Sequence, residues 1–103
     1  CSVVNGLSDL SHPCQALADL FTLRERFGSF ENLSLAYIGD ANNVARSLAT
    51  CCAKLGVAFR LAAPKGYQFD EDYSQRLKAS VPRADVTVTT DPLAAAAGAT
   101  AVY

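Results

Sequence analysis

The chain has 103 residues, of which 50% are hydrophobic and 18% are charged, and its formal net charge is −1. This composition predicts one globular domain and excludes a disordered segment. The balance of charge disfavours nucleic acid and anionic membranes as partners, and no apolar run is long enough to cross a bilayer. Four cysteines without C-x-x-C spacing and a single histidine disfavour a metal site and indicate reduced thiols, so we expect a cytoplasmic protein.

Strands and helices are expected to alternate along the chain. The N-terminus predicts a short apolar strand at Val3 and Val4, followed by a turn. The expected helices cover about 13–27, 42–55, 73–81 and 91–98, and the other expected strands cover 33–38, 57–63, 85–89 and 100–103. This alternation predicts a single α/β domain over residues 1–103. Its fold would be a Rossmann-like three-layer sandwich, with a parallel sheet of about four strands and helices on both faces.

The start of the first helix holds the only histidine of the chain. With His12 as the N-cap, Pro13 takes the first helical position, where its missing N–H costs nothing. Gln15 takes the third position, from which its side chain can reach back to the cap. A helix start also offers unpaired N–H groups and a positive dipole end, which suit an anion or a polarised carbonyl. The local pattern therefore fits either a capping role or a binding role.

Cys14 stands two residues after His12, at the same helix start. A catalytic thiol needs a base that faces it across a site, and the chain has no second histidine to serve as one. The sequence therefore indicates that Cys14 packs against or lines a pocket and is not a nucleophile.

The turn Gly39–Asn43 stands where a dinucleotide-binding domain would place its glycine-rich loop. It lacks the G-x-G-x-x-G pattern, which argues against a nicotinamide or flavin cofactor. It carries instead the polar side chains Asp40, Asn42 and Asn43 at the end of an expected strand. One asparagine can cap the next helix, and a ligand role for the other stays open. The acidic run 70–72 is interpreted as solvated charges at a helix start.

Four motifs in order along the chain resemble the ornithine carbamoyltransferase family. They are N-G-L-S-D at 5–9, H-P-C-Q at 12–15, G-D-A-N-N at 39–43 and A-P-K-G-Y at 63–67. The first of these turns and the double asparagine favour the ornithine branch over the aspartate branch of the superfamily. Ala41 stands where glycine is common, and Arg46 where a smaller or imidazole side chain is common.

The resemblance implies that carbamoyl phosphate and L-ornithine are the substrates, with no cofactor and no metal. The δ-amino group of ornithine would attack the carbonyl carbon to give citrulline and phosphate. By the same resemblance, His12 would be catalytic and donate to the carbonyl oxygen. His12, Pro13, Cys14 and Gln15 would form the carbamoyl-phosphate motif, with Gln15 holding the carbamoyl amide. Asn43 would bind the amino-acid end of ornithine.

The resemblance also implies that the chain is the ornithine-binding domain with the preceding H-P-x-Q helix, at about 12–28. The carbamoyl-phosphate domain, with its S-x-R-T-R loop, would be absent. We therefore expect the fragment alone to be inactive and the full-length enzyme to be a homotrimer. An aspartate or other amine-specific carbamoyltransferase, or a non-catalytic binding domain derived from one, remains the alternative.

Overall fold

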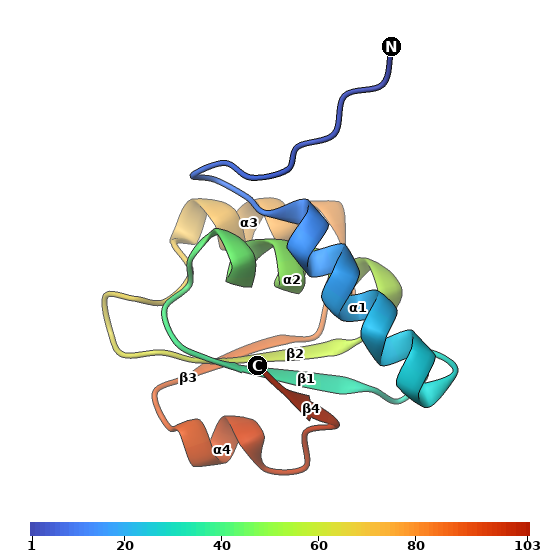
Figure 1. Ribbon diagram of the computed structural model, residues 1–103. Helices are drawn as coiled ribbons and strands as arrows, with labels where there is room; N and C mark the ends of the chain where they lie inside the picture. Colours follow the sequence, from blue (N-terminus) through green and yellow to red (C-terminus); the bar gives the residue numbers. More distant parts are fainter.

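The computed structural model describes residues 1–103 as four helices and four strands that alternate along the chain (Figure 1). The helices and strands are α1 (Pro13–Phe27), β1 (Ser34–Ile38), α2 (Asn43–Leu55), β2 (Ala58–Ala62), α3 (Glu71–Ser80), β3 (Val86–Thr89), α4 (Pro92–Ala96) and β4 (Ala101–Val102). None of the helices is both long and apolar enough to span a membrane.

The strands form one parallel sheet in the order β3-β2-β1-β4. Leu35 of β1 lies opposite Phe59 of β2 on one side and Ala101 of β4 on the other. From β1 the chain first runs outward through β2 to β3, and it then crosses back to place β4 beside β1. The direction of the sheet order therefore reverses at β1, and the carboxyl ends of all four strands meet at one edge.

Helices cover both faces of the sheet, as the sequence predicts. Helices α1, α2 and α3 lie on one face and α4 lies on the other (Figure 1). The main core lies under the first three helices and includes Leu48, Cys52, Phe59 and Leu61, none of which is more than 1% exposed. The core under α4 consists only of alanines, Ala36, Ala62 and Ala95. Side chains this small let a five-residue helix pack close to the sheet.

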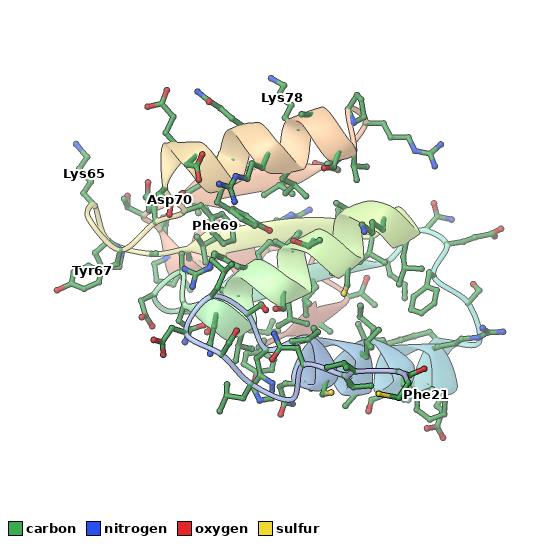
Figure 2. All side chains as sticks on the ribbon, turned by 90° about the horizontal axis from the view of Figure 1, so that it is seen from above. Phe21, Lys65, Tyr67, Phe69, Asp70 and Lys78 are labelled. Carbon is green, nitrogen blue, oxygen red and sulfur yellow. The ribbon has the colours of Figure 1, made fainter.

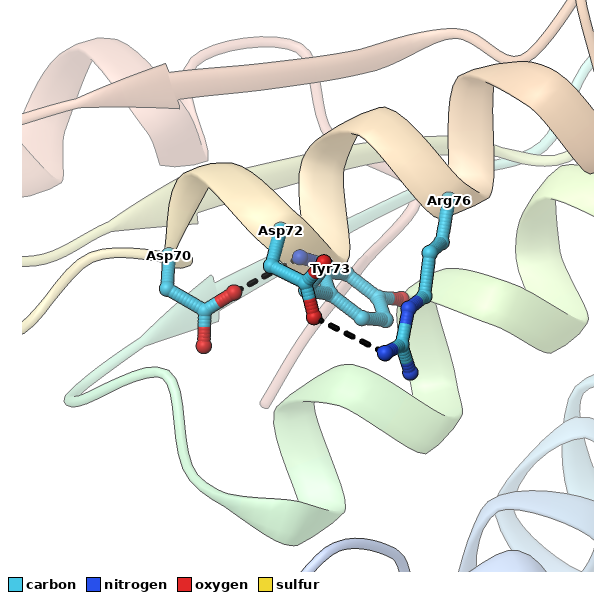
Figure 3. A network of polar contacts seen from close by, with 4 residues as sticks. All are labelled: Asp70, Asp72, Tyr73 and Arg76. Carbon is cyan, nitrogen blue, oxygen red and sulfur yellow. Dashed lines mark hydrogen bonds and ion pairs between the residues drawn. The ribbon is translucent and has the colours of Figure 1, made fainter.

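Side-chain caps set the starts of three helices. Asn42 caps α2 by accepting from the Ala45 N–H at 3.0 Å, so the structure selects Asn42 over Asn43. Asp70 accepts from the Tyr73 N–H at 2.6 Å (Figure 3), and Asp91 caps α4 one residue before Pro92. The acidic run 70–72 thus lies at a helix start, as expected.

Two expectations about the N-terminal part are wrong. Val3 and Val4 form no strand: their side chains are 90% and 75% exposed, and the segment runs away from the sheet with no strand to pair with (Figure 1). Gln15 does not reach back to the start of α1, which has no side-chain cap. Its amide donates instead to the Asp19 carboxylate, one turn further along the helix. A third difference lies near the C-terminus, where helix α4 ends at Ala96, two residues before the expected end.

Candidate functional site

The candidate site lies at the carboxyl end of β1, where the sheet order reverses. In open parallel sheets this switch point is where ligands bind, because the turns on either side separate and leave a crevice. The turn that follows β1 begins at Gly39, whose φ of +150° favours glycine, and whose N–H donates to the Ala62 carbonyl at 3.0 Å. Asp40 is exposed after it, and Asn42 and Asn43 open α2.

His12 lies at the start of α1 and contacts α2 through its backbone. Its N–H donates to the Ser47 hydroxyl of α2 at 2.9 Å, and Ser47 is only 7% exposed. The Nδ1 atom of the His12 ring is buried without a hydrogen-bond partner. A buried polar atom without a partner costs about 1–3 kcal/mol, so the position of this ring calls for a structural or functional reason.

Gln15 lies on the next part of α1, with its side chain oriented by a carboxylate. Its Nε2 donates to Oδ1 of Asp19 at 3.0 Å, which leaves its Oε1 free to accept a hydrogen bond. The other carboxylate oxygen of Asp19 is buried and has no partner. The sequence offered no clue to this role of Asp19 beyond its i, i+4 spacing from Gln15.

Pro13 and Cys14 complete the H-P-C-Q motif. Pro13 takes the first helical position, as expected. Cys14 is exposed, and its thiol donates to the Asn5 carbonyl at 3.5 Å. The thiol is therefore at the surface beside the loop 5–11 and is not packed in the core.

Asn43 connects the double-asparagine turn to the N-G-L-S-D motif at 5–9. Its Nδ2 donates to the Ser8 carbonyl at 2.8 Å, and its Oδ1 accepts from the Val44 N–H at 2.8 Å. One N–H of the Asn43 amide remains available to a ligand. The loop 5–11, which leads into the H-P-C-Q motif, and the double-asparagine turn are 35 residues apart in sequence between Ser8 and Asn43, and they meet at one end of the molecule.

Arg46 and Ser47, which the sequence did not assign to the site, strengthen this junction. The Arg46 guanidinium donates to the carbonyl oxygens of Asp9, Leu10 and Ala41. Both residues lie on the first turns of α2. The only signal for Arg46 in the sequence was that an arginine stands where a smaller or imidazole side chain is common in the family that the motifs resemble.

The loop after β2 forms the next wall of this end of the molecule. The Tyr67 carbonyl accepts from the Ala41 N–H at 2.7 Å, so the A-P-K-G-Y motif lies against the turn after β1. Lys65 and Tyr67 point outward to solvent, whereas Phe69 turns inward against Tyr73 with ring centroids 4.9 Å apart (Figure 2). Three of the four motifs noted in the sequence, and part of the first, thus lie around one edge of the sheet.

Burial governs the ionisation of groups next to this site. Burial raises the pKa of Tyr37, a shift that its hydrogen bond to Asn42 partly offsets. Burial also raises the pKa of Tyr73, and it raises the pKa of the Cys52 thiol to about 12. These groups stay protonated at neutral pH, so they serve as neutral walls and hydrogen-bonding partners.

The fold and the site define an α/β ligand-binding domain without a dinucleotide-binding loop. A family model described as "Aspartate/ornithine carbamoyltransferase, Asp/Orn binding domain" matches residues 31–103. The chain belongs to this aspartate/ornithine carbamoyltransferase family.

Relatives in the family carry the name of the ornithine enzyme. The chain is 53% identical over 102 residues to the ornithine carbamoyltransferase of Thermosynechococcus vestitus, covering 98% of this chain and 33% of that protein. It is 52% identical to the catabolic ornithine carbamoyltransferase of Halobacterium salinarum, with 98% and 32% covered. The chain therefore spans about 33% of the length of these relatives.

Solved structures agree with this similarity. The ornithine carbamoyltransferase from Pyrococcus furiosus superposes with a TM-score of 0.90 at 40% identity, covering 98% of this chain and 33% of that one. The enzyme from Thermus thermophilus superposes with a TM-score of 0.85 at 46% identity and the same coverage. The parallel sheet and its flanking helices thus have the arrangement found in this family.

Proposed function

We propose that this chain is the amino-acid-binding third of an ornithine carbamoyltransferase, together with the helix that carries the H-P-C-Q motif. The full-length enzyme would transfer the carbamoyl group of carbamoyl phosphate to the δ-amino group of L-ornithine, giving L-citrulline and phosphate. The proposal rests on the meeting of the loop 5–11, which leads into the H-P-C-Q motif, with the double-asparagine turn, where Asn43 donates to the Ser8 carbonyl. The similarity to enzymes of that name over 98% of the chain supports it.

In this proposal His12 is the catalytic donor. Attack of the amine on the carbonyl carbon places negative charge on the carbonyl oxygen, and a donor held at that position stabilises the transition state. The unpartnered ring of His12 and its place at the positive end of α1 support this role.

The other motif residues bind substrate in this proposal. Gln15 accepts from the carbamoyl amide through its free Oε1, and the carbamoyl-phosphate end lies against Pro13 and Cys14 at the start of α1. Asn43 holds the amino-acid end of ornithine with its remaining N–H. No step needs a cofactor or a metal, since the leaving group is phosphate and the nucleophile is the substrate amine.

The phosphate would be gripped mainly by residues outside these 103, in a carbamoyl-phosphate domain. We therefore expect the chain alone to be inactive and the full-length enzyme to act as a homotrimer. We also place the enzyme in the cytoplasm, a choice supported by four free cysteines, which persist in reducing compartments.

The test is citrulline formation by the full-length enzyme with carbamoyl phosphate and either ornithine or aspartate. We expect product with ornithine only. Loss of the His12 donor in His12→Ala should lower kcat about 100- to 1000-fold. Thr22→Ala serves as the matched control, because Thr22 is exposed on the same helix and bonds only the Ala18 carbonyl.

Three results would contradict the proposal in different ways. Carbamoyl-aspartate as product would move the chain to the sister enzyme and remove the role of Asn43. Equal activity of His12→Ala and Thr22→Ala would remove the role of His12. No product with either amine would support a non-catalytic binding domain.

A further inference from the structure

Arg46 makes an unusual set of contacts for a residue on the first turns of a helix. Its Nε donates to the Leu10 carbonyl at 3.0 Å, its Nη2 to the Asp9 carbonyl at 3.0 Å, and its Nη1 to the Ala41 carbonyl at 3.1 Å. One side chain thus binds two segments that lie more than thirty residues apart in sequence. Each accepting carbonyl belongs to a loop and not to a helix or strand.

We propose that Arg46 is a positioning residue for carbamoyl transfer, which fixes the loop carrying His12 against the turn carrying Asn43. This inference rests on the proposed function, because the two residues matter together only if they act on one pair of substrates.

The guanidinium is suited to this task and a lysine is not. Its five N–H donors point in fixed directions within one plane, so a single group can serve three carbonyls at once. An ammonium on a flexible stem has no fixed planar arrangement of donors and would hold one carbonyl at a time. The geometry therefore requires arginine and not merely a positive charge.

The backbone of Arg46 is itself held in place. The Tyr73 hydroxyl of α3 donates to the Arg46 carbonyl at 2.7 Å, and the Thr50 hydroxyl donates to the same oxygen at 2.9 Å. The side chain therefore extends from an anchored point of α2 toward the loop 5–11, which is exposed at residues 5–10. We call the three side-chain hydrogen bonds of Arg46 the clamp. Because Arg46 is anchored to α2, the clamp ties the position of that loop to the position of α2.

Two further contacts flank the clamp and set its consequence for His12. Asn43 bonds the Ser8 carbonyl before the clamped residues, and Ser47 accepts the His12 N–H after them. Without Arg46 the carbonyls of Asp9 and Leu10 return to water, and the loop is tied only at its two ends. A catalytic donor displaced by about 1 Å costs about 100-fold in rate, so the clamp should affect kcat.

The test compares Arg46→Gln and Arg46→Lys in the full-length enzyme. Arg76→Gln is the matched control. Arg46 and Arg76 line one cavity between α2, α3 and the loop 5–11, but Arg76 pairs with Asp72 at 3.1 Å on the surface (Figure 3). Two readouts are combined: citrulline kinetics, and hydrogen exchange of the amides of residues 8–12.

For Arg46→Gln we expect kcat to fall about 10- to 100-fold with the KM for ornithine little changed, and exchange at residues 8–12 to become faster. Arg46→Lys should recover only part of the loss, and Arg76→Gln should match the parent enzyme. The KM for ornithine distinguishes positioning of His12 from a general loosening of the domain, which would raise it.

If the parent enzyme makes citrulline and Arg46→Gln keeps its kcat, the inference is wrong and the proposed function stands. Unchanged exchange at residues 8–12 in Arg46→Gln overturns the clamp whatever the activity. A parent enzyme that makes no citrulline overturns the proposed function and with it the catalytic part of the inference.

Discussion

Gln15 illustrates how a neighbouring charge decides what a side-chain amide offers to a ligand. The amide has a donor end and an acceptor end, and a carboxylate beside it can only accept. The Asp19 carboxylate therefore holds Nε2 at 3.0 Å and leaves Oε1 free to accept a hydrogen bond. The buried, unpartnered Oδ2 of Asp19 is the cost of this arrangement, because a charged oxygen without a donor is destabilising.

From this we expect Asp19→Asn to lower activity without lowering stability. An asparagine can pair with Gln15 in either orientation, so the amide would no longer present only its acceptor to the carbamoyl group. In the full-length enzyme kcat/KM for carbamoyl phosphate should fall about 10-fold. This fall corresponds to roughly 1.4 kcal/mol, which is the size expected for one misoriented hydrogen bond. The free energy of unfolding should not fall, because a neutral amide replaces a buried charge.

Steady-state kinetics and urea unfolding of the same variant check both parts. Glu25→Gln is the control, since Glu25 is exposed on the same helix. A loss of stability together with the loss of activity would mean that Asp19 supports the fold and does not orient Gln15.

Some residues of the candidate site could be named from the sequence and others could not. His12, Gln15 and Asn43 could be named because they belong to motifs that resemble a known family, and their roles stay predictions. Arg46 and Ser47 make contacts across more than thirty residues, and nothing in local pattern reports such a pairing. Capping rules also misplaced the Gln15 amide. The N-cap N–H that its oxygen would bond, that of His12, already donates to Ser47, and its Nε2 donates to the Asp19 carboxylate one turn away.

At the scale of the element, the N-cap residue of α2 makes more side-chain hydrogen bonds than those of the other helices. Asn42 Oδ1 accepts from the Ala45 N–H at 3.0 Å and also from the Tyr37 hydroxyl at 3.2 Å. The helix it opens contributes Leu48 and Cys52 to the core. Loss of this cap therefore affects a helix start, a buried tyrosine and the main core together.

We expect Asn42→Ala to lower the free energy of unfolding by about 2 kcal/mol, at the upper end for a helix cap, because two hydrogen bonds are lost. Asp70→Ala should cost about 1 kcal/mol, because Asp70 makes one cap bond, to the Tyr73 N–H, on a more exposed helix. Chemical denaturation of the two variants beside the parent chain measures both values. A larger loss for Asp70→Ala would contradict this ranking.

The elements themselves were largely readable from the sequence. The two central strands, β1 and β2, appear as nearly continuous apolar runs, and β3 appears as an alternating run at Val86–Thr89. Each of the four paired strands was predicted within one or two residues of its ends. Val3 and Val4 had the same local character but no neighbour to pair with, and strand formation depends on such a neighbour. Helix α4 ended early because Ala97 leaves helical geometry with ψ of 118° before Gly98, a choice that a run of alanines does not encode.

At the scale of the whole molecule, four thiol and phenol groups on or beside α2 share one property. Burial raises the pKa values of Cys51, Cys52, Tyr37 and Tyr73. All four groups are neutral when protonated, so their raised pKa values have no effect on stability near neutral pH. Their effect appears only in alkali, where the unfolded chain releases protons that the folded chain retains.

We expect the free energy of unfolding to fall as the pH rises from about 9 toward 12. For Cys52 the sign follows from its ordinary pKa of 9.0 and its folded value of about 12: between them the unfolded thiol is ionised and the folded one is not. Unfolding is thus favoured increasingly across that window. Urea titrations at a series of pH values measure the slope, with Cys52→Ala expected to flatten it and exposed Cys1→Ala to leave it unchanged. An equal slope in Cys52→Ala would mean that the buried thiol is not what limits stability in alkali.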